Sequence, residues 1–137
     1  MKLVAAFIFK KNTIRHVEDL QFVSCLKRNS VRELMHEFVR IAAANIQDTR
    51  KIFEHPPWQF ILLKLNNQTL VMVTDIEYPV NVSYELLTKL YHDPDVLHNI
   101  IRECQDPRTI SPVYRIGQQL DEILIIIHEN VDKILQE

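Results

Sequence analysis

The sequence predicts an α+β fold, with two strands before the first helix and three strands after it. Two patterns lead to this prediction. Short stretches rich in aliphatic, aromatic and β-branched residues have the composition of strands. Longer stretches with apolar residues every three or four positions have the periodicity of amphipathic helices. Because the chain has 137 residues, one compact domain is the default expectation.

The first two strands are predicted before residue 20. Residues 3–9 are apolar at every position, which is typical of a strand inside a sheet that is covered on both faces. After a polar break at Lys10, Lys11 and Asn12, residues 13–18 place Ile14 and Val17 among polar or charged neighbours. We interpret this second stretch as a partly exposed strand.

A helix is predicted from Ser30. Ser30 and Glu33 have the spacing of a capping box, in which each side chain accepts a hydrogen bond from a free amide of the first turn. The apolar residues then recur at helical spacing, so one face of this helix must be buried. These residues are Val31, Leu34, Met35, Phe38, Ile41, Ala42 and Ile46.

Three further strands are predicted between residues 50 and 74. Residues 50–55 form a short stretch that Pro56 and Pro57 end, and prolines are tolerated at a sheet edge. Residues 58–65 and 69–74 are dense in strand-forming residues. The two asparagines between them, Asn66 and Asn67, tolerate positive φ, so we expect a tight hairpin.

Two short helices and a helical tail complete the chain. Pro79 is suited to a helix start, and apolar residues at helical spacing follow until Asp93-Pro94. Asp95 is expected to cap a second short helix that ends near Cys104. Prolines at 107 and 112 mark a linker, and residues 118–137 resume helical periodicity without proline or glycine.

Composition excludes several classes of function. The 16 basic and 18 acidic residues give a net charge of -2, so nucleic acid is not an expected partner. The single glycine excludes the usual glycine-rich nucleotide loops. No apolar run approaches the roughly 18 residues of a membrane span. Two distant cysteines and the lack of a signal peptide favour a reducing, cytosolic setting.

No pattern of reactive side chains points to catalysis. No two of the six histidines are four residues apart on a predicted helix, and no Cys-x-x-Cys motif is present. No serine has the glycine-flanked elbow of a nucleophile. Cys25 and Cys104 are interpreted as small hydrophobic residues. We therefore expect no enzyme, no catalytic residue, no metal and no cofactor.

The tail has the periodicity of a helix that packs against other helices. Leu120, Ile123, Ile127, Asn130 and Ile134 follow a heptad seam. The run at 123–127 also places five consecutive apolar side chains all the way round the helix, at about 100° per residue. This segment must therefore lie between several elements. Either it is the last core helix of the domain or it enters a bundle of several chains.

Three motifs resemble those of longin-domain R-SNAREs, and among them the lipid-anchored members. The chain opens with Met-Lys-Leu at the first strand. Residues 29–35, Asn-Ser-Val-Arg-Glu-Leu-Met, resemble the entry into the first longin helix, and residues 75–79, Asp-Ile-Glu-Tyr-Pro, resemble the turn before the second. Residues 120–135 are similar to the opening half of a synaptobrevin-type SNARE motif. Together these matches cover nearly the whole chain.

The resemblance implies a profilin-like longin fold. In that fold a five-stranded, mostly antiparallel sheet carries one helix on one face and two on the other, and a C-terminal helical segment follows. The first helix and the edge strand form a groove that binds a SNARE segment. The residues expected to line this groove are Leu34, Met35, Phe38, Ala42, Ile52 and Phe53.

The resemblance also assigns the tail residues to layers of a coiled-coil four-helix bundle. The layer residues are Leu120, Ile123, Ile127, Asn130, Ile134 and Glu137. Glu137 falls where the family has its central arginine, and a buried glutamate there would be an acceptor without a donor. The R-type assignment therefore rests on overall similarity. Because the motif stops at its midpoint, we expect a truncated form of a longer protein.

The implied function is vesicle fusion in vesicle-mediated transport. Residues 1–111 would form the longin domain, and residues 112–137 would form the linker and the first half of the SNARE helix. The expected partners are cognate Q-SNAREs and the chain's own SNARE segment, in cis or by domain swap. Membrane contact would come through a lipid anchor or segment outside this chain, on the cytoplasmic face of Golgi, endosomal or vesicle membranes. The alternative is a non-fusogenic longin subunit of a coat adaptor or tethering complex.

Overall fold

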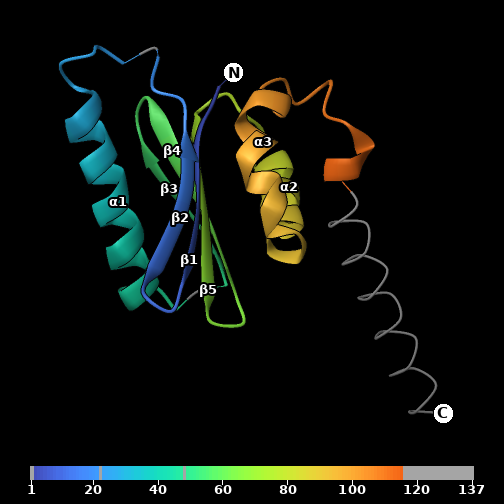
Figure 1. Ribbon diagram of the computed structural model, residues 1–137, viewed down its shortest axis with the longest axis horizontal. Coiled ribbons are helices and arrows are strands. Elements are labelled where there is room, and N and C mark those ends of the chain that lie inside the picture. The colour runs from blue at the N-terminus through green and yellow to red at the C-terminus, as the bar shows by residue number, and fades with distance from the viewer. Residues whose placement is uncertain (1, 22, 48, 116–137) are drawn as a thin grey trace.

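The computed structural model describes residues 2–21, 23–47 and 49–115. A sheet stands between one helix on its first face and two helices on its second (Figure 1). The predicted helical tail at 118–137 lies outside the described residues, and so do the six predicted layer residues.

The order of elements is the one that the sequence predicts, and the predicted α+β class is confirmed. The strands are β1 (Leu3–Lys10), β2 (Thr13–Glu18), β3 (Arg50–His55), β4 (Trp58–Leu65) and β5 (Gln68–Asp75). The helices are α1 (Arg28–Asn45), α2 (Val80–His92) and α3 (Leu97–Glu103), with 3-10 turns η1 (Pro94–Val96) and η2 (Pro112–Tyr114).

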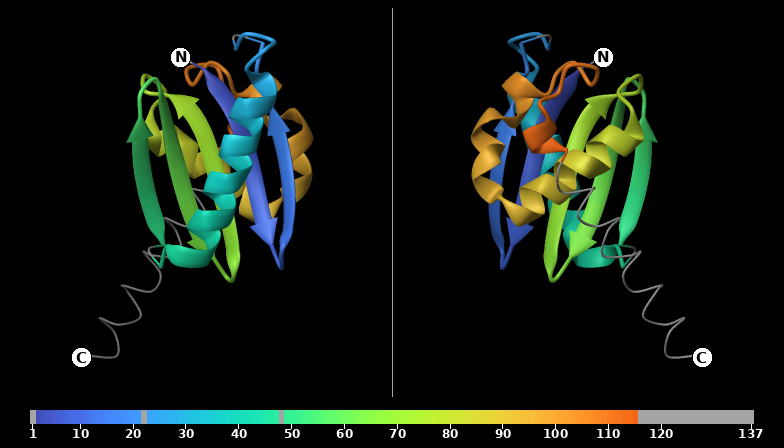
Figure 2. Two further views of the ribbon diagram at one scale, coloured as in Figure 1. Left: turned by 90° about the vertical axis from the view of Figure 1, so that its left-hand side faces the viewer. Right: turned by 90° about the vertical axis from the view of Figure 1, so that its right-hand side faces the viewer.

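The five strands form one antiparallel sheet in the order β2-β1-β5-β4-β3. Strand β1 is an inner strand and is buried from Leu3 to Ile8, as its unbroken apolar run predicts. Strands β2 and β3 are the two edges. Helix α1 crosses one face, and α2 and α3 cover the other (Figure 2).

Both tight hairpins use residues with positive φ. Asn66 and Asn67 have φ of 48° and 64°, which confirms the predicted turn between β4 and β5. Lys11 and Asn12 have φ of 49° and 65° and form the corresponding turn between β1 and β2. The two turns lie at the same end of the sheet (Figure 1).

The predicted start of α1 was wrong. The helix begins at Arg28, its N-cap is Lys27, and no cap hydrogen bond from a side chain is made. Ser30 therefore lies within the first turn, and the expected capping box does not form. The preceding loop is instead fixed by the Arg28 guanidinium, which donates to the carbonyl oxygens of Leu20 at 2.9 Å, Gln21 at 3.1 Å and Val23 at 3.0 Å.

The predicted cap at Asp95 was also wrong. Asp95 lies within η1, and the N-cap of α3 is Val96, again without a cap hydrogen bond from a side chain. The physical reason is Pro94, which starts a 3-10 turn that runs directly into α3. Asp95 is consequently one residue too early to serve as the cap.

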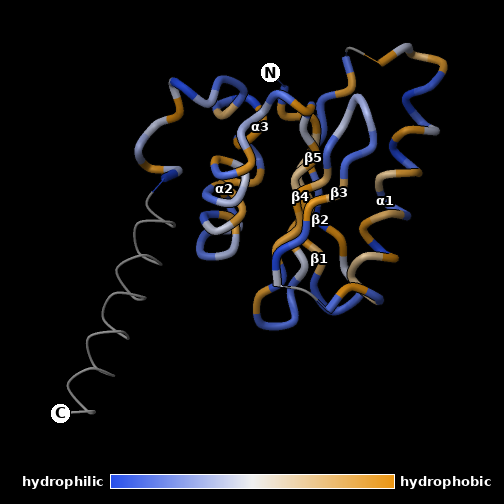
Figure 3. Tube along the Cα trace, turned by 180° about the vertical axis from the view of Figure 1, so that it is seen from behind, coloured by the Kyte–Doolittle hydropathy of each residue, from blue (hydrophilic) through white to orange (hydrophobic). Residues whose placement is uncertain are grey.

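Two hydrophobic clusters hold the helices on the sheet, and Figure 3 shows hydrophobic residues concentrated along the central strands. The cluster under α1 includes Phe7, Met35 and Val39. The cluster under α2 and α3 includes Ile8 and Leu86 and continues to Tyr114 in η2. Packing on the second face therefore extends beyond residue 111.

The Asp-Ile-Glu-Tyr-Pro motif at 75–79 joins β5 to α2. The Asp75 carboxylate accepts a hydrogen bond from the Tyr78 amide at 3.1 Å, which closes the turn. The Tyr78 side chain is buried, and its hydroxyl donates to the Cys104 carbonyl oxygen at 2.6 Å. The motif thus fixes the end of α3 as well as the start of α2.

Candidate functional site

Helix α1 presents two different flanks beside the side that packs on the sheet. At about 100° per residue, Met35, Val39 and Ala42 share the buried side. Leu34, Phe38 and Ile41 fall together on one flank, while Arg32, His36 and Arg40 fall on the other. We call the first the apolar flank and the second the polar flank.

The polar flank faces the edge strand β2. Arg32 forms an ion pair with Glu18. The rings of His36 and His16 meet at right angles with their centroids 4.3 Å apart, and both contact Phe7 of β1. These contacts fix the rotation of α1 about its own axis, and that rotation turns the apolar flank toward β3.

The apolar flank is linked to β3 by an aromatic cluster. The Phe38 ring lies 5.3 Å from the Phe53 ring of β3 and 4.4 Å from the Phe60 ring of β4, measured between centroids. Leu34 is 70% exposed and Ile41 is 54% exposed on the same flank. An exposed apolar strip therefore runs along α1 beside the edge of the sheet.

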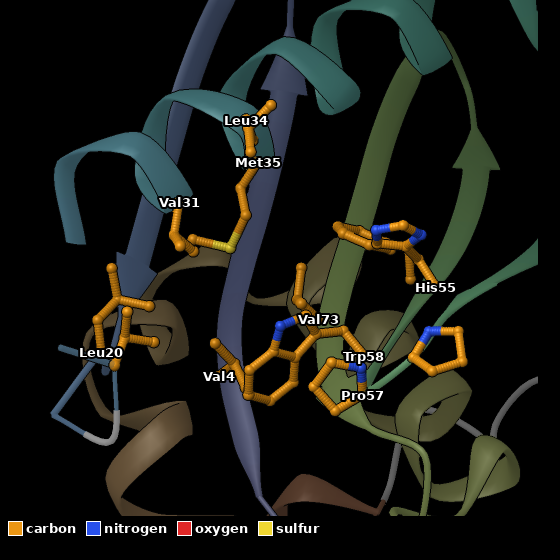
Figure 4. A pocket seen from close by; sticks show the side chains of 12 residues that line it. Val4, Leu20, Val31, Leu34, Met35, His55, Pro57, Trp58 and Val73 are labelled. Carbon is orange, nitrogen blue, oxygen red and sulfur yellow. The ribbon is translucent and has the colours of Figure 1, made fainter. Parts of the chain in front are cut away.

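A pocket of about 220 Å³ opens at the N-terminal end of this strip. Figure 4 shows Val31 and Met35 extending from α1 toward the sheet side chains Val4, Val73 and Trp58. The lining is almost wholly apolar and comes from the β2–α1 loop, α1, the β3–β4 turn and the four strands β1, β3, β4 and β5. Its residues are Val4, Leu20, Val23, Val31, Leu34, Met35, His55, Pro56, Pro57, Trp58, Phe60 and Val73.

We call the pocket together with the strip Leu34, Phe38, Ile41 and Phe53 the α1–β3 groove. Of the predicted lining residues, Leu34 and Met35 line the pocket, and Phe38 and Phe53 lie in the strip. Ala42 is only 2% exposed and belongs to the core beneath α1. The structure therefore brings four of the six predicted residues to this groove.

Ile52 lies on the other face of the sheet. It pairs with Ile61, which belongs to the cluster under α2 and α3, whereas Phe53 pairs with Phe60 on the α1 side. Neighbouring residues of a strand point to opposite faces, so Ile52 and Phe53 cannot line the same groove. Ile52 is 41% exposed at the β3 edge.

Several residues of the groove were not predicted as lining. Trp58 and Phe60 alternate with Gln59 along β4, and this period of two places both on the α1 side. That signal was present in the sequence. Leu20 and Val23 come from an irregular loop whose path depends on the Arg28 contacts, and no local pattern reveals it.

The chemistry of the groove is suited to binding an apolar segment. His55 is the only titratable side chain that lines the pocket among the described residues. Strand β3 pairs only with β4 in the described part of the chain, so its outer edge also offers backbone donors and acceptors. Apolar side chains and an open strand edge together bind helical or extended peptides.

The described residues offer no comparable centre for reactive chemistry. No group of three or more His, Cys, Asp or Glu side chains that would hold a metal is found in 2–21, 23–47 and 49–115. Burial raises the pKa of the Cys104 thiol to about 12, the opposite of what a nucleophile needs. Within the same residues, no helix has the length and hydropathy required to cross a membrane.

Similarity to curated proteins extends over most of the chain. Proteins named synaptobrevin homolog YKT6 are 25% identical in Debaryomyces hansenii, over 86% of this chain and 70% of the relative, and in Saccharomyces cerevisiae, over 90% and 73%. The protein of the same name in Eremothecium gossypii is 32% identical over 48% of this chain and 44% of the length of that relative. No protein-family model matches the chain. These relatives confirm the resemblance to longin-domain R-SNAREs.

Proposed function

We propose that this chain is a longin-type R-SNARE of vesicle fusion and transport, in which the folded body regulates the C-terminal SNARE segment. The similarity to synaptobrevin homologues over most of the chain is the single observation that carries the proposal. The five-stranded sheet between α1 and the α2–α3 pair is the body that such a protein needs. The α1–β3 groove supplies the regulatory surface.

The chain's own tail is the proposed occupant of this groove. Its apolar run at 123–127 is too broad for one neighbouring helix to cover. The exposed strip on α1 leaves Leu34 and Ile41 in water, where fully burying each such side chain is worth about 1.5–3 kcal/mol. Docking the tail in the groove removes both surfaces from water at once, in the same chain or by exchange between two chains.

Release of the tail makes it available to other SNAREs. The proposed partners are cognate Q-SNAREs, with Leu120, Ile123, Ile127, Asn130, Ile134 and Glu137 as successive layers of a four-helix bundle. Glu137 in place of the family's arginine weakens the central layer unless a partner supplies a donor. The proposed location is the cytoplasmic face of Golgi, endosomal or vesicle membranes, reached through a lipid anchor or a segment outside this chain.

Hydrophobic-dye binding tests the closed state. Deleting residues 118–137 is expected to raise dye fluorescence, because the strip and pocket lose their cover. Adding back a peptide of residues 112–137 is expected to lower it again. No rise on deletion would contradict docking of the tail in the groove.

Two matched substitutions test whether the dye and the tail peptide bind at the α1–β3 groove. Leu34→Ser in the deletion form is expected to reduce dye binding and to weaken binding of the tail peptide, since Leu34 lies in both the strip and the pocket. Ile76→Ser is the control, because Ile76 is 45% exposed but lies in the turn after β5. Equal effects of the two substitutions would show that the peptide binds exposed apolar residues generally.

A further inference from the structure

The β1–β2 hairpin gathers three cations at one end of the sheet. Lys10 pairs with Thr13 of β2 and with Gln68 of β5, and Ile8 pairs with Arg15 in the neighbouring row. Directly paired residues share a face of the sheet, and so do residues two apart on a strand. Ile8 belongs to the cluster under α2 and α3, so Lys10 and Arg15 lie on that same face.

A hollow of about 340 Å³ lies where these side chains meet. Lys11, at the tip of the turn with φ of 49°, completes its cationic lining. Besides the three cations, its lining includes Thr13, Gln68 and Pro94 of η1. Within the described part of the chain no carboxylate lines the hollow, and the donors present are ammonium, guanidinium, hydroxyl and amide groups.

Acidic side chains of the described residues do not neutralise the three cations. Over the described residues, neither Lys10, Lys11 nor Arg15 has an acidic side chain as a partner. The carboxylates nearest in sequence to Pro94 are Asp93, which pairs with Lys89 at 3.7 Å, and the exposed Asp95. Like charges on neighbouring strands repel each other, and a bound anion would relieve that repulsion.

We propose that this hollow, the cationic hairpin site, binds the phosphorylated headgroup of an anionic lipid at a membrane surface. A phosphate monoester carries about -1.5 to -2 charges at pH 7 and accepts several hydrogen bonds, which matches three adjacent cations. The site is at the exposed end of the sheet, where a planar surface reaches it. The negative surface potential of an anionic membrane attracts all three exposed cations at once.

The cationic hairpin site is separate from the α1–β3 groove. It lies on the α2–α3 face at the end of the β1–β2 hairpin, whereas the groove lies on the α1 face. Figure 1 shows the β1–β2 turn at the opposite end of the sheet from the start of α1, where the pocket of the groove opens. Lipid binding at the cationic hairpin site does not depend on docking of the tail in the α1–β3 groove.

Vesicle flotation with the full chain tests the proposal. Three vesicle types are compared: phosphatidylcholine alone, phosphatidylcholine with phosphatidylserine, and phosphatidylcholine with phosphatidylinositol 4-phosphate at equal surface charge. Binding is expected only to the charged vesicles, with tighter binding to the phosphoinositide and a loss at high salt. Equal binding to both charged vesicles, or binding to phosphatidylcholine alone, would overturn the proposal.

The test variant combines Lys10→Thr, Lys11→Asn and Arg15→Thr, which keep strand propensity and tolerate the positive φ at position 11. At about fivefold per cation near a charged membrane, affinity is expected to fall roughly 100-fold. The control combines Lys27→Ser, Arg40→Ala and Arg102→Ala, three exposed cations on α1, its N-cap and α3. Both triple variants change the net charge from -2 to -5, by the loss of three positive charges.

The two triple variants separate a local site from bulk charge. The control is expected to bind phosphoinositide vesicles within about threefold of the unmodified chain, because charges beyond a Debye length are screened. Equal losses in both variants would overturn the site. Displacement of the chain from vesicles by inorganic phosphate at the headgroup concentration would identify soluble phosphate as the ligand and overturn the membrane assignment. Thermal unfolding of each variant verifies that it folds.

Discussion

The ring of His36 on α1 meets the ring of His16 on β2 at an interplanar angle of 84°, with 4.3 Å between the ring centroids. Phe7 stacks on His16 at 5.6 Å and meets the edge of His36 at 5.3 Å. This three-ring contact joins α1 to the first two strands. It therefore holds in place the helix that forms one wall of the α1–β3 groove.

Acidification is expected to weaken this contact. Burial lowers the pKa of His36, the His16 ring, Arg40 and Arg32 lower it further, and Glu18 partly opposes them. The unfolded chain therefore binds a proton at His36 more readily than the folded chain does. By linkage, stability contributed by neutral His36 is lost as pH falls below the ordinary histidine pKa of about 6.5. Urea unfolding at a series of pH values measures this loss.

Two substitutions isolate the contribution of His36. His36→Phe keeps an aromatic ring on Phe7 and removes the titration, so its free energy of unfolding is expected to depend less on pH near 6. His98→Gln, at an exposed position on α3, is expected to retain the full dependence of the unmodified chain. An unchanged pH dependence in His36→Phe would refute the role of this residue.

Lys64 is expected to stabilise the last turn of α1 from outside the helix. That turn contains no basic residue of its own, and the Lys64 ammonium on β4 donates to the carbonyl oxygens of Ala43, at 3.0 Å, and Ile46. Lys64→Met removes these charge-assisted hydrogen bonds at a helix C-terminus, and we expect a loss of about 1–2 kcal/mol. Faster hydrogen exchange of the Ile46 amide, which bonds to Ala42, reports the local effect. Arg102→Met, at an exposed position on α3, is the control for loss of charge alone.

Tyr78 is expected to stabilise the contact between the turn before α2 and the end of α3. Tyr78 is 1% exposed, its hydroxyl donates to the carbonyl oxygen of Cys104, and burial raises the pKa of that hydroxyl. Tyr78→Phe leaves a buried carbonyl oxygen without this donor, so we expect a loss of about 1–3 kcal/mol in the free energy of unfolding. Tyr84→Phe, which keeps the ring that Arg50 covers at 4.9 Å, is expected to change stability little.

Features that depend on residues close together in the sequence were predicted more accurately than features that depend on contacts between distant residues. The strands and the Asn66–Asn67 turn depend on local periodicity and backbone preference, and these were predicted. The buried side of α1 was predicted only in part, because Leu34 and Ile41 are exposed while Val39, which was not predicted, is buried. The start of α1 depends on Arg28, whose guanidinium binds carbonyl oxygens of the preceding loop, so the capping pattern at Ser30 gave the wrong start. The placement of Ile52 was decidable from strand alternation, because its neighbour Phe53 faces α1.

The ion pair between Arg115 and Glu85 is expected to be asymmetric in its response to substitution. The Arg115 guanidinium donates to Glu85 at 2.8 Å, and it follows Tyr114, which is buried in the cluster under α2 and α3. The Glu85 side chain is only 9% exposed, while that of Arg115 is 35% exposed. Removal of the cation therefore leaves a buried carboxylate without its ion-pair partner. Removal of the negative charge leaves a cation that water can reach.

Arg115→Met is accordingly expected to cost about 2 kcal/mol, less than the roughly 3–5 kcal/mol of fully buried pairs because Arg115 is partly solvated. Glu85→Gln is expected to cost less than about 1 kcal/mol, since the amide oxygen still accepts from Arg115. When Glu85→Gln is already present, the added cost of Arg115→Met is smaller, because no buried carboxylate remains to lose its partner. Urea unfolding of the three variants measures these differences, with Arg102→Met as the exposed control. Equal costs for the two single substitutions would show that the pair contributes no more than a surface salt bridge.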